Sequence, residues 1–387
     1  MNTPTATHSA ATAPEKAARS KYSCVACGGE AVWNPAKQKL LCAFCGTESP
    51  LPLEKETPAG IQSGDVVEHD LASALQNIKG ESRGWARTAR MIKCQHCQAI
   101  SVFDATKQAK SCEFCGASNI VNYDETDDVI RPEGVLPFQV SEPQARDLIR
   151  AWYGKLWWAP NKLKSRALTD TAKGVYLPYW TFDAMVDARW QAEAGYHYYV
   201  TEQYYDNGEP RTRQVQRTRW EYASGSINHF FDDTLVCGSK GIHPTLLRSV
   251  EPFPTTDPGS KALKAYDPAY VSGWTVERYQ IDLIGAAKLS RERMTGETRT
   301  LCSNQVPGDT QRNLQVEANF SRQTFKHILA PVWLMSYTYG AKDFQVIINA
   351  VTGKIDGEYP KSWIKISLAV LAFIIVALVI FSAGGKR

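Results

Sequence analysis

The sequence CVACGGEAVWNPAKQKLLCAFC spans residues 24–45, and CQHCQAISVFDATKQAKSCEFC spans residues 94–115. Both segments have the spacing C-x2-C-x14-C-x2-C, and the residues between their cysteine pairs are alike. The two segments therefore form an internal repeat. Its cysteines are Cys24, Cys27, Cys42, Cys45, Cys94, Cys97, Cys112 and Cys115.

Each C-x2-C pair places two sulfur atoms on one tight turn, and two such turns supply the four thiolates of a closed tetrahedral zinc site. Gly28, Gly46 and Gly116 follow three of the four pairs and allow the backbone to turn around the metal, whereas Gln98 follows the fourth. The pattern predicts two tandem zinc ribbons with two structural Zn²⁺ ions per chain. Because a ribbon of about 30 residues buries little core, we expect a Cys→Ser change to unfold its own ribbon and spare the other.

Two alternatives remain open for these cysteines: disulfide-bonded loops, and iron in place of zinc. Closely spaced C-x-x-C pairs without a preceding secretory signal favour zinc and a reducing compartment. His96 lies inside one pair but is expected to face solvent, since four thiolates already complete the shell. The remaining cysteines, Cys237 and Cys302, are interpreted as small buried apolar residues.

The composition is that of an ordinary globular protein. The chain has 387 residues, of which 43% are hydrophobic and 22% charged, so it has room for two or three domains. Its formal net charge of +4 is too small to indicate nucleic-acid binding by itself.

The predicted fold class is α+β, with a β-rich domain after the ribbons. We expect a disordered arm over 1–21, zinc ribbon 1 over 22–48, a linker over 49–90, zinc ribbon 2 over 91–120, a β-rich α+β domain over 130–360 and a transmembrane helix over 364–385. In the linker, the apolar residues Val67, Leu71, Leu75 and Ile78 predict a short helix that packs between the ribbons.

Several elements of the large domain can be predicted. Ser141 is positioned to cap a helix whose apolar face includes Ile149. The Asp206-Asn207-Gly208 turn predicts a hairpin between strands at 196–205 and 211–222. A helix is expected over 284–302, and strands over 314–320, 325–339 and 344–350.

Four arginines recur at alternate positions of the second hairpin strand: Arg211, Arg213, Arg217 and Arg219. On a strand they share one face. This face is interpreted either as an ordinary solvated surface or as an anion-binding surface for lipid head groups, an acidic partner or nucleic acid.

The C-terminal segment is almost uninterruptedly apolar from Ile366 to Phe381, with Trp363 and Lys365 before it. This pattern is typical of a membrane-spanning helix with interfacial anchors. The sequence thus predicts a tail-anchored, single-pass protein of the inner cell membrane with its N-terminal body in the cytoplasm, and the bilayer as a partner.

The sequence lacks two common catalytic motifs. The sequence contains no G-x-x-x-x-G-K-[ST] or H-E-x-x-H motif, and Asp232-Asp233 is interpreted as a solvated pair in a loop. We therefore expect a protein that is not an enzyme, with no small-molecule substrate.

The paired ribbons, the stretch VYLPYWTFDA at 175–184 and the stretch FKHILAPVWL at 325–334 together resemble one protein family. The chain is similar to bacterial membrane proteins with a TFIIB-type zinc ribbon, some of which carry a primosomal protein N′ (replication helicase) label. The resemblance implies association with SPFH-domain (flotillin-like) scaffolds. It transfers no catalytic residue, only the eight cysteines as metal ligands.

The sequence thus favours a membrane-anchored zinc-ribbon adaptor or scaffold that docks a protein partner at the cytoplasmic face of the membrane. The alternative is a nucleic-acid-binding protein linked to transcription or replication.

Overall fold

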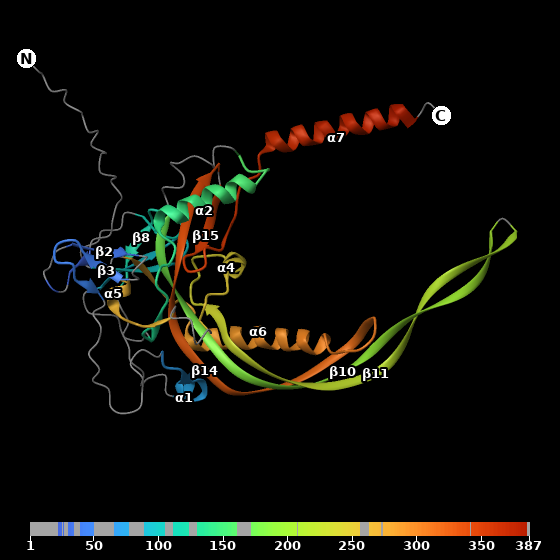
Figure 1. Cartoon of the computed structure of the whole chain (residues 1–387), viewed down its shortest axis with the longest axis horizontal. Helices are drawn as coiled ribbons and strands as arrows, with labels where there is room; N and C mark the ends of the chain where they lie inside the picture. Colours follow the sequence, from blue (N-terminus) through green and yellow to red (C-terminus); the bar gives the residue numbers. More distant parts are fainter. Residues whose placement is uncertain are drawn as a thin grey trace, which may run out of the picture.

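A computed structural model shows a mixed α+β body from which a long β-hairpin and a C-terminal helix project (Figure 1). The structure describes residues 22–24, 26, 30–34, 39–49, 66–76, 89–104, 111–123, 130–160, 172–206, 208–255, 263–271, 274–340 and 342–384. The disordered N-terminal segment expected over 1–21 lies outside these residues, as do Cys27, Gly28 and most of the 49–90 linker.

The first cysteine repeat forms a separate small sheet of four antiparallel strands. In order these are β1 (Tyr22–Ser23), β2 (Glu30–Asn34), β3 (Lys39–Cys42) and β4 (Glu48–Ser49). This is the antiparallel arrangement that the ribbon spacing predicts.

The second cysteine repeat belongs to the main sheet. Its strands β6 (Ala89–Cys94), β7 (Ile100–Asp104) and β8 (Ile120–Asn122) pair antiparallel. Strand β7 also pairs with β13 (Thr275–Arg278), which in turn runs parallel to the start of the long strand β10. One twelve-stranded sheet therefore connects the second ribbon to the body.

Three very long strands organise the large domain: β10 (Lys173–Asp206), β11 (Glu209–Cys237) and β14 (Thr310–Tyr339). Strand β10 is central, antiparallel to β11 on one side and to β14 on the other. The hairpin predicted at Asp206–Gly208 is confirmed, since Asp206 pairs with Glu209 across the turn and Gly208 has φ 86°. The strands expected over 314–320 and 325–339 are parts of the single strand β14.

The first half of β10 is buried on both faces. Tyr176 faces a cluster that contains α2 (Glu142–Lys155), β15 (Lys342–Asn349) and β16 (Ile355–Gly357). The expected Ser141 start of α2 is confirmed, because Gln144 Oε1 accepts a hydrogen bond from the Ser141 backbone N–H at 2.8 Å.

The opposite face of this half of the sheet is covered by the second ribbon and by α4 (Pro244–Val250). Val175, Leu177 and Tyr179 of β10 point to this side, where Cys94 and Cys112 are also buried. The remaining short elements of the body are β9 (Gly134–Val135), β12 (Lys264–Ala265) and α5 (Pro268–Val271).

Beyond Phe182 only one face of the long strands is covered. The helix expected over 284–302 is confirmed as α6 (Leu283–Ser303), which lies along this face (Figure 1). From Ala184 to Ala194 the side chains of β10 alternate between this core and solvent, the pattern of an antiparallel sheet with one wet face.

The linker helix α1 (Leu71–Gln76) lies elsewhere than predicted. Its buried residues Leu71 and Ala74 join the core under α6, and the preceding strand β5 (His69–Asp70) pairs with β14. The helix therefore packs on the large domain instead of between the ribbons. Val67 is exposed, and Ile78 lies outside the described residues.

The C-terminal helix α7 (Trp363–Gly384) begins at the body, where Lys365 Nζ donates hydrogen bonds to the carbonyls of Trp157 and Ala159 at 3.0 and 2.8 Å. Its side chains are described as far as Ala377 and are exposed from Ser367 onward.

Within the part of the chain that the structure describes, no helix is both long enough and apolar enough to cross a membrane. This finding contradicts the transmembrane helix expected over 364–385 and the inner-membrane location built on it. The α+β class itself is observed.

Candidate metal centres

The second repeat brings its four cysteines together as a set of converging sulfur atoms. Cys94, Cys97, Cys112 and Cys115 place their sulfurs within 4.8 Å of one another. The Sγ–Sγ distances are 3.6 Å for Cys94–Cys115 and 3.6 Å for Cys97–Cys112. Tetrahedral zinc with Zn–S bonds of about 2.3 Å requires sulfurs about 3.8 Å apart, so this donor set fits a zinc ion.

The turns around these sulfurs have the same local geometry in both pairs. Gln98 N donates to Cys94 O at 3.0 Å, and Gly116 N donates to Cys112 O at 3.0 Å. Both turn residues are left-handed, with φ 65° at Gln98 and 77° at Gly116. A glutamine therefore adopts the conformation that glycine adopts more easily, and its side-chain amide donates to Gln95 O at 2.8 Å.

The thiols of this centre perturb one another strongly. Hydrogen bonds from the side chains of Cys112 and Cys97 lower the pKa of Cys115 to about 2. The neighbouring Cys115 side chain raises the pKa of Cys112 to about 12. Binding of a metal requires these cysteines in the thiolate form.

The second centre is anchored to the body through the turn that carries Phe114. This side chain is fully buried, and its carbonyl accepts hydrogen bonds from Ser336 of β14 and from Gln345 of β15, the latter at 3.2 Å. Glu113 forms an ion pair with Lys173 of β10 at 2.7 Å. These anchoring residues were not identified from the sequence, because each is more than 50 positions from its partner.

The first repeat forms a similar cluster. The sulfurs of Cys24, Cys42 and Cys45 lie within 4.8 Å of one another, with Cys24 Sγ and Cys45 Sγ 3.5 Å apart. Gly46 follows with φ 73° and donates to Cys42 O at 3.0 Å, as in the second repeat. The fourth expected ligand, Cys27, lies outside the described residues.

The two clusters, one of four cysteines and one of three described cysteines, could each bind a metal ion. Four thiolates around zinc leave no position for water or substrate, so such a centre stabilises a fold instead of catalysing a reaction. His96 is not part of the sulfur set; its Nε2 lies 3.8 Å from Asp343 Oδ2.

The two other cysteines lie in separate parts of the core. Cys237 and Cys302 are both buried, as expected, and burial raises the pKa of each thiol.

The arginine face is present on β11 and is exposed, but it is also rich in carboxylates. Arg213 and Arg217 both pair with Glu202 on β10, at 3.4 and 2.5 Å. The other two pairs are Arg211 with Asp206, at 3.0 Å, and Arg219 with Glu221, at 2.9 Å.

A cluster of carboxylates was not recognised in the sequence. Asp183 of β10 and Asp232 and Asp233 of β11 offer oxygens within 4.8 Å of one another. Asp233 is buried, so the interpretation of Asp232-Asp233 as a solvated loop pair is wrong for Asp233. Only the pairing of β10 with β11 brings Asp183 to this position.

One relative is identified by comparison with known proteins. The chain is distantly homologous to the uncharacterized protein YdjG of Bacillus subtilis (strain 168), with 23% identity over 262 residues, which cover 66% of this chain and 73% of that protein. No protein-family model and no solved structure matches the chain.

Proposed function

We propose that the protein is a zinc-ribbon adaptor that docks a protein partner through its projecting hairpin. In this proposal the two cysteine clusters act as structural zinc centres, so they rigidify the molecule and do no chemistry. We propose no catalytic role and no small-molecule substrate.

The observation that carries this proposal is that the β10–β11 hairpin extends beyond the end of the neighbouring strand β14. Pairing between β10 and β14 ends at Gly195 and Thr310, whereas β10 and β11 remain paired as far as Asp206 and Glu209. Residues 196–206 and 209–219, together called the hairpin arm or simply the arm below, therefore form a two-stranded ribbon that extends away from the body (Figure 1). Such a ribbon is marginally stable in water without a packing partner.

The exposed side chains of the arm suit a protein interface. Tyr199 and Tyr205 are 66% and 79% exposed. On the opposite face, Arg213 lies over the ring of Tyr204, with 5.5 Å between the guanidinium carbon and the ring centroid. Tyrosine and arginine are among the residues enriched in the energetic centres of protein interfaces.

The resemblance to TFIIB-type zinc-ribbon proteins associated with SPFH-domain scaffolds suggests which partner to test first. We propose that the arm binds such a scaffold protein. The distant homology to YdjG adds no function, since that protein is uncharacterized.

The test is binding of a purified SPFH-domain protein to the zinc-loaded chain and to the double variant Tyr199→Ser/Tyr205→Ser. Loss of binding in this variant supports the proposal. The matched control is Tyr222→Ser, because Tyr222 is 72% exposed on the neighbouring strand β11 but lies outside the arm. Equal binding by both variants, or no binding by the wild type, contradicts it.

The alternative, a nucleic-acid-binding protein, draws on the alternation of arginines with tyrosines on the arm. Arg219 lies 5.9 Å from the ring of Tyr196, an arrangement that suits phosphates and stacked bases. The carboxylates paired with these arginines oppose it. Binding that weakens steeply with salt, and disappears on replacing the four arginines with alanine, would favour this alternative.

A further inference from the structure

The carboxylate cluster lies where the central strand β10 is irregular against both of its neighbours. The register of β10 shifts against β11 between Phe182 and Ala184, and against β14 between Asp183 and Met185. Such bulges redirect a side chain out of the regular alternation of a strand. On β11, Asp233 has φ 52°, a left-handed conformation that is uncommon for a residue other than glycine.

This backbone arrangement turns two buried carboxylates toward each other. Asp183 is 4% exposed and Asp233 is 6% exposed. Asp183 Oδ1 accepts a hydrogen bond from the Asp233 backbone N–H at 2.6 Å, and Asp183 Oδ2 accepts one from Thr324 Oγ1 at 3.0 Å. Both oxygens of Asp183 are therefore held in place by hydrogen bonds.

The two carboxylate oxygens of Asp233 differ in their surroundings: one lies next to a cation and the other does not accept a hydrogen bond from any described residue. Its Oδ1 lies 2.9 Å from the ammonium of Lys326. Its Oδ2 is buried and accepts no hydrogen bond from any residue in the described part of the chain. A buried carboxylate oxygen without a donor is energetically costly, and it marks a position where a ligand would complete the site.

The charges of the cluster do not balance. The Lys326 ammonium also pairs with Glu68, at 3.0 Å. Among the described residues it is the one cation found in an ion pair with this group of carboxylates, which comprises Glu68, Asp183, Asp232 and Asp233. Burial, together with the charges of Glu68 and Asp233, raises the pKa of Asp183 to about 7. The cluster thus lacks positive charge when all of its carboxylates are ionised.

We propose that Asp183, Asp232 and Asp233 bind one hard divalent cation of the Mg²⁺, Mn²⁺ or Ca²⁺ class. Carboxylate oxygens are the ligands that these cations prefer, whereas the thiolates of the ribbons select zinc. Asp233 Oδ2 supplies the buried ligand, and the exposed Asp232 lies at the rim, where the ion is exchanged with solvent. Water molecules complete the coordination shell.

Bound at this position, the cation would connect β10 and β11 at the register shift between Phe182 and Ala184. It would be a third metal centre, independent of the ribbons in both ligand chemistry and position.

The test is titration of the full-length, zinc-loaded chain with Mn²⁺ at about pH 8, where free Mn²⁺ is measured by electron paramagnetic resonance and zinc by elemental analysis. We expect a single Mn²⁺ site that Mg²⁺ or Ca²⁺ competes for, with the zinc content unchanged. Asp233→Asn and Asp232→Asn should each weaken Mn²⁺ binding at least about tenfold, because even an outer-shell partner contributes that much.

The matched control is Asp187→Asn, an exposed aspartate on the same strand β10 outside the cluster. Asp232→Asn removes a ligand at the exposed rim, so it tests the site even where Asp233→Asn impairs folding. The proposal is overturned when the wild type binds no Mn²⁺ up to about 1 mM, the weak end of the range for protein Ca²⁺ sites. It is also overturned when Asp187→Asn weakens binding as much as Asp232→Asn.

Discussion

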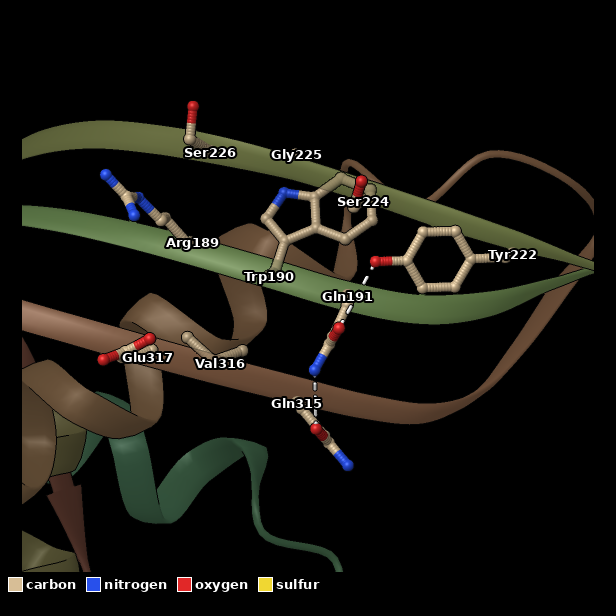
Figure 2. Close-up of a pocket in the computed structure, with 10 residues that line it drawn as sticks. All are labelled: Arg189, Trp190, Gln191, Tyr222, Ser224, Gly225, Ser226, Gln315, Val316 and Glu317. Atoms are coloured by element: carbon tan, nitrogen blue, oxygen red, sulfur yellow. Dashed lines mark hydrogen bonds between the residues drawn. The ribbon is translucent and has the colours of Figure 1, made fainter.

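The indole ring of Trp190 on β10 lies directly over Gly225, its cross-strand partner on β11. A Cβ atom added at Gly225 would come within 2.6 Å of Trp190 Cζ2, so only glycine leaves room for the ring. Both residues line an open groove of about 640 Å³ on the three long strands (Figure 2). Gln191, which also lines the groove, bridges β11 and β14: it accepts a hydrogen bond from Tyr222 Oη at 3.3 Å and donates one to Gln315 Oε1 at 2.8 Å.

The first prediction concerns this contact. Gly225→Ala should lower the free energy of unfolding by about 1–3 kcal/mol, because the new methyl group displaces the Trp190 ring from a packed position. Urea unfolding followed by tryptophan fluorescence measures the change. The control is Gly296→Ala in the middle of α6, where nothing lies within 4 Å of an added Cβ. That change should raise stability by up to about 1 kcal/mol, and a matching loss in both variants would refute the packing explanation.

The second prediction distinguishes the two ribbons. Cys94→Ser should remove about one equivalent of zinc and lower the melting temperature of the whole body, because β6 to β8 are part of the main sheet and Cys94 lies in its core. Cys24→Ser should also remove about one equivalent of zinc but leave the main transition in place, since the first ribbon has its own sheet.

Differential scanning calorimetry and elemental analysis on the same samples measure both effects. Cys302→Ala, at a buried cysteine outside the clusters, should retain all of the zinc. The assignment of separate roles fails if Cys24→Ser and Cys94→Ser shift the main transition equally.

The third prediction concerns the pH dependence of stability. His327 is fully buried, its ring stacked on Trp180 at a centroid distance of 4.6 Å, and burial lowers its pKa to about 4. Below about pH 6.5 the unfolded chain takes up a proton at this histidine while the folded chain does not. The stability that His327 contributes is therefore present above pH 6.5 and is lost as the pH falls toward 4.

Asp183 has the opposite effect on the pH dependence of stability. Its pKa is raised to about 7, so its contribution to stability is greatest below the ordinary aspartate pKa and is lost as the pH rises through about 7. The two groups partly cancel in the wild type. The comparison must therefore be made between the wild type and His327→Gln.

When the pH is lowered from 7 to 4.5, the free energy of unfolding of the wild type should fall by about 2–3 kcal/mol more than that of His327→Gln. Urea titrations of both proteins at the two pH values measure this difference. Parallel pH profiles would show that His327 does not stay neutral in the folded state.

The fourth prediction concerns the start of α6. Asp282 caps this helix, with its Oδ1 accepting a hydrogen bond from Gly285 N at 2.8 Å. Asp282→Ala should lower stability by about 1 kcal/mol, and Asp282→Ser should restore most of it, because serine is also a good N-cap. Equal losses in both variants would assign the effect to something other than capping.

The sequence by itself determined the local elements of this protein. Three of the C-x2-C pairs (Cys42/Cys45, Cys94/Cys97 and Cys112/Cys115), the Asp206–Gly208 turn and the Ser141 helix start are each set by a few neighbouring residues, and each is observed where it was predicted. The ligand sets of the metal clusters follow for the same reason, since spacing along the chain fixes the distance between sulfurs on one turn.

Only the tertiary structure decided the long-range arrangement. Pairing of β7 with β13, about 175 positions apart, joins the second ribbon to the body, and bulges in two neighbouring strands bring Asp183 to Asp233. The placement of α1 against β14 is of the same kind. Such contacts depend on register and on the shape of the remaining core, because hydrophobic burial is non-directional and favours no particular partner among distant apolar segments.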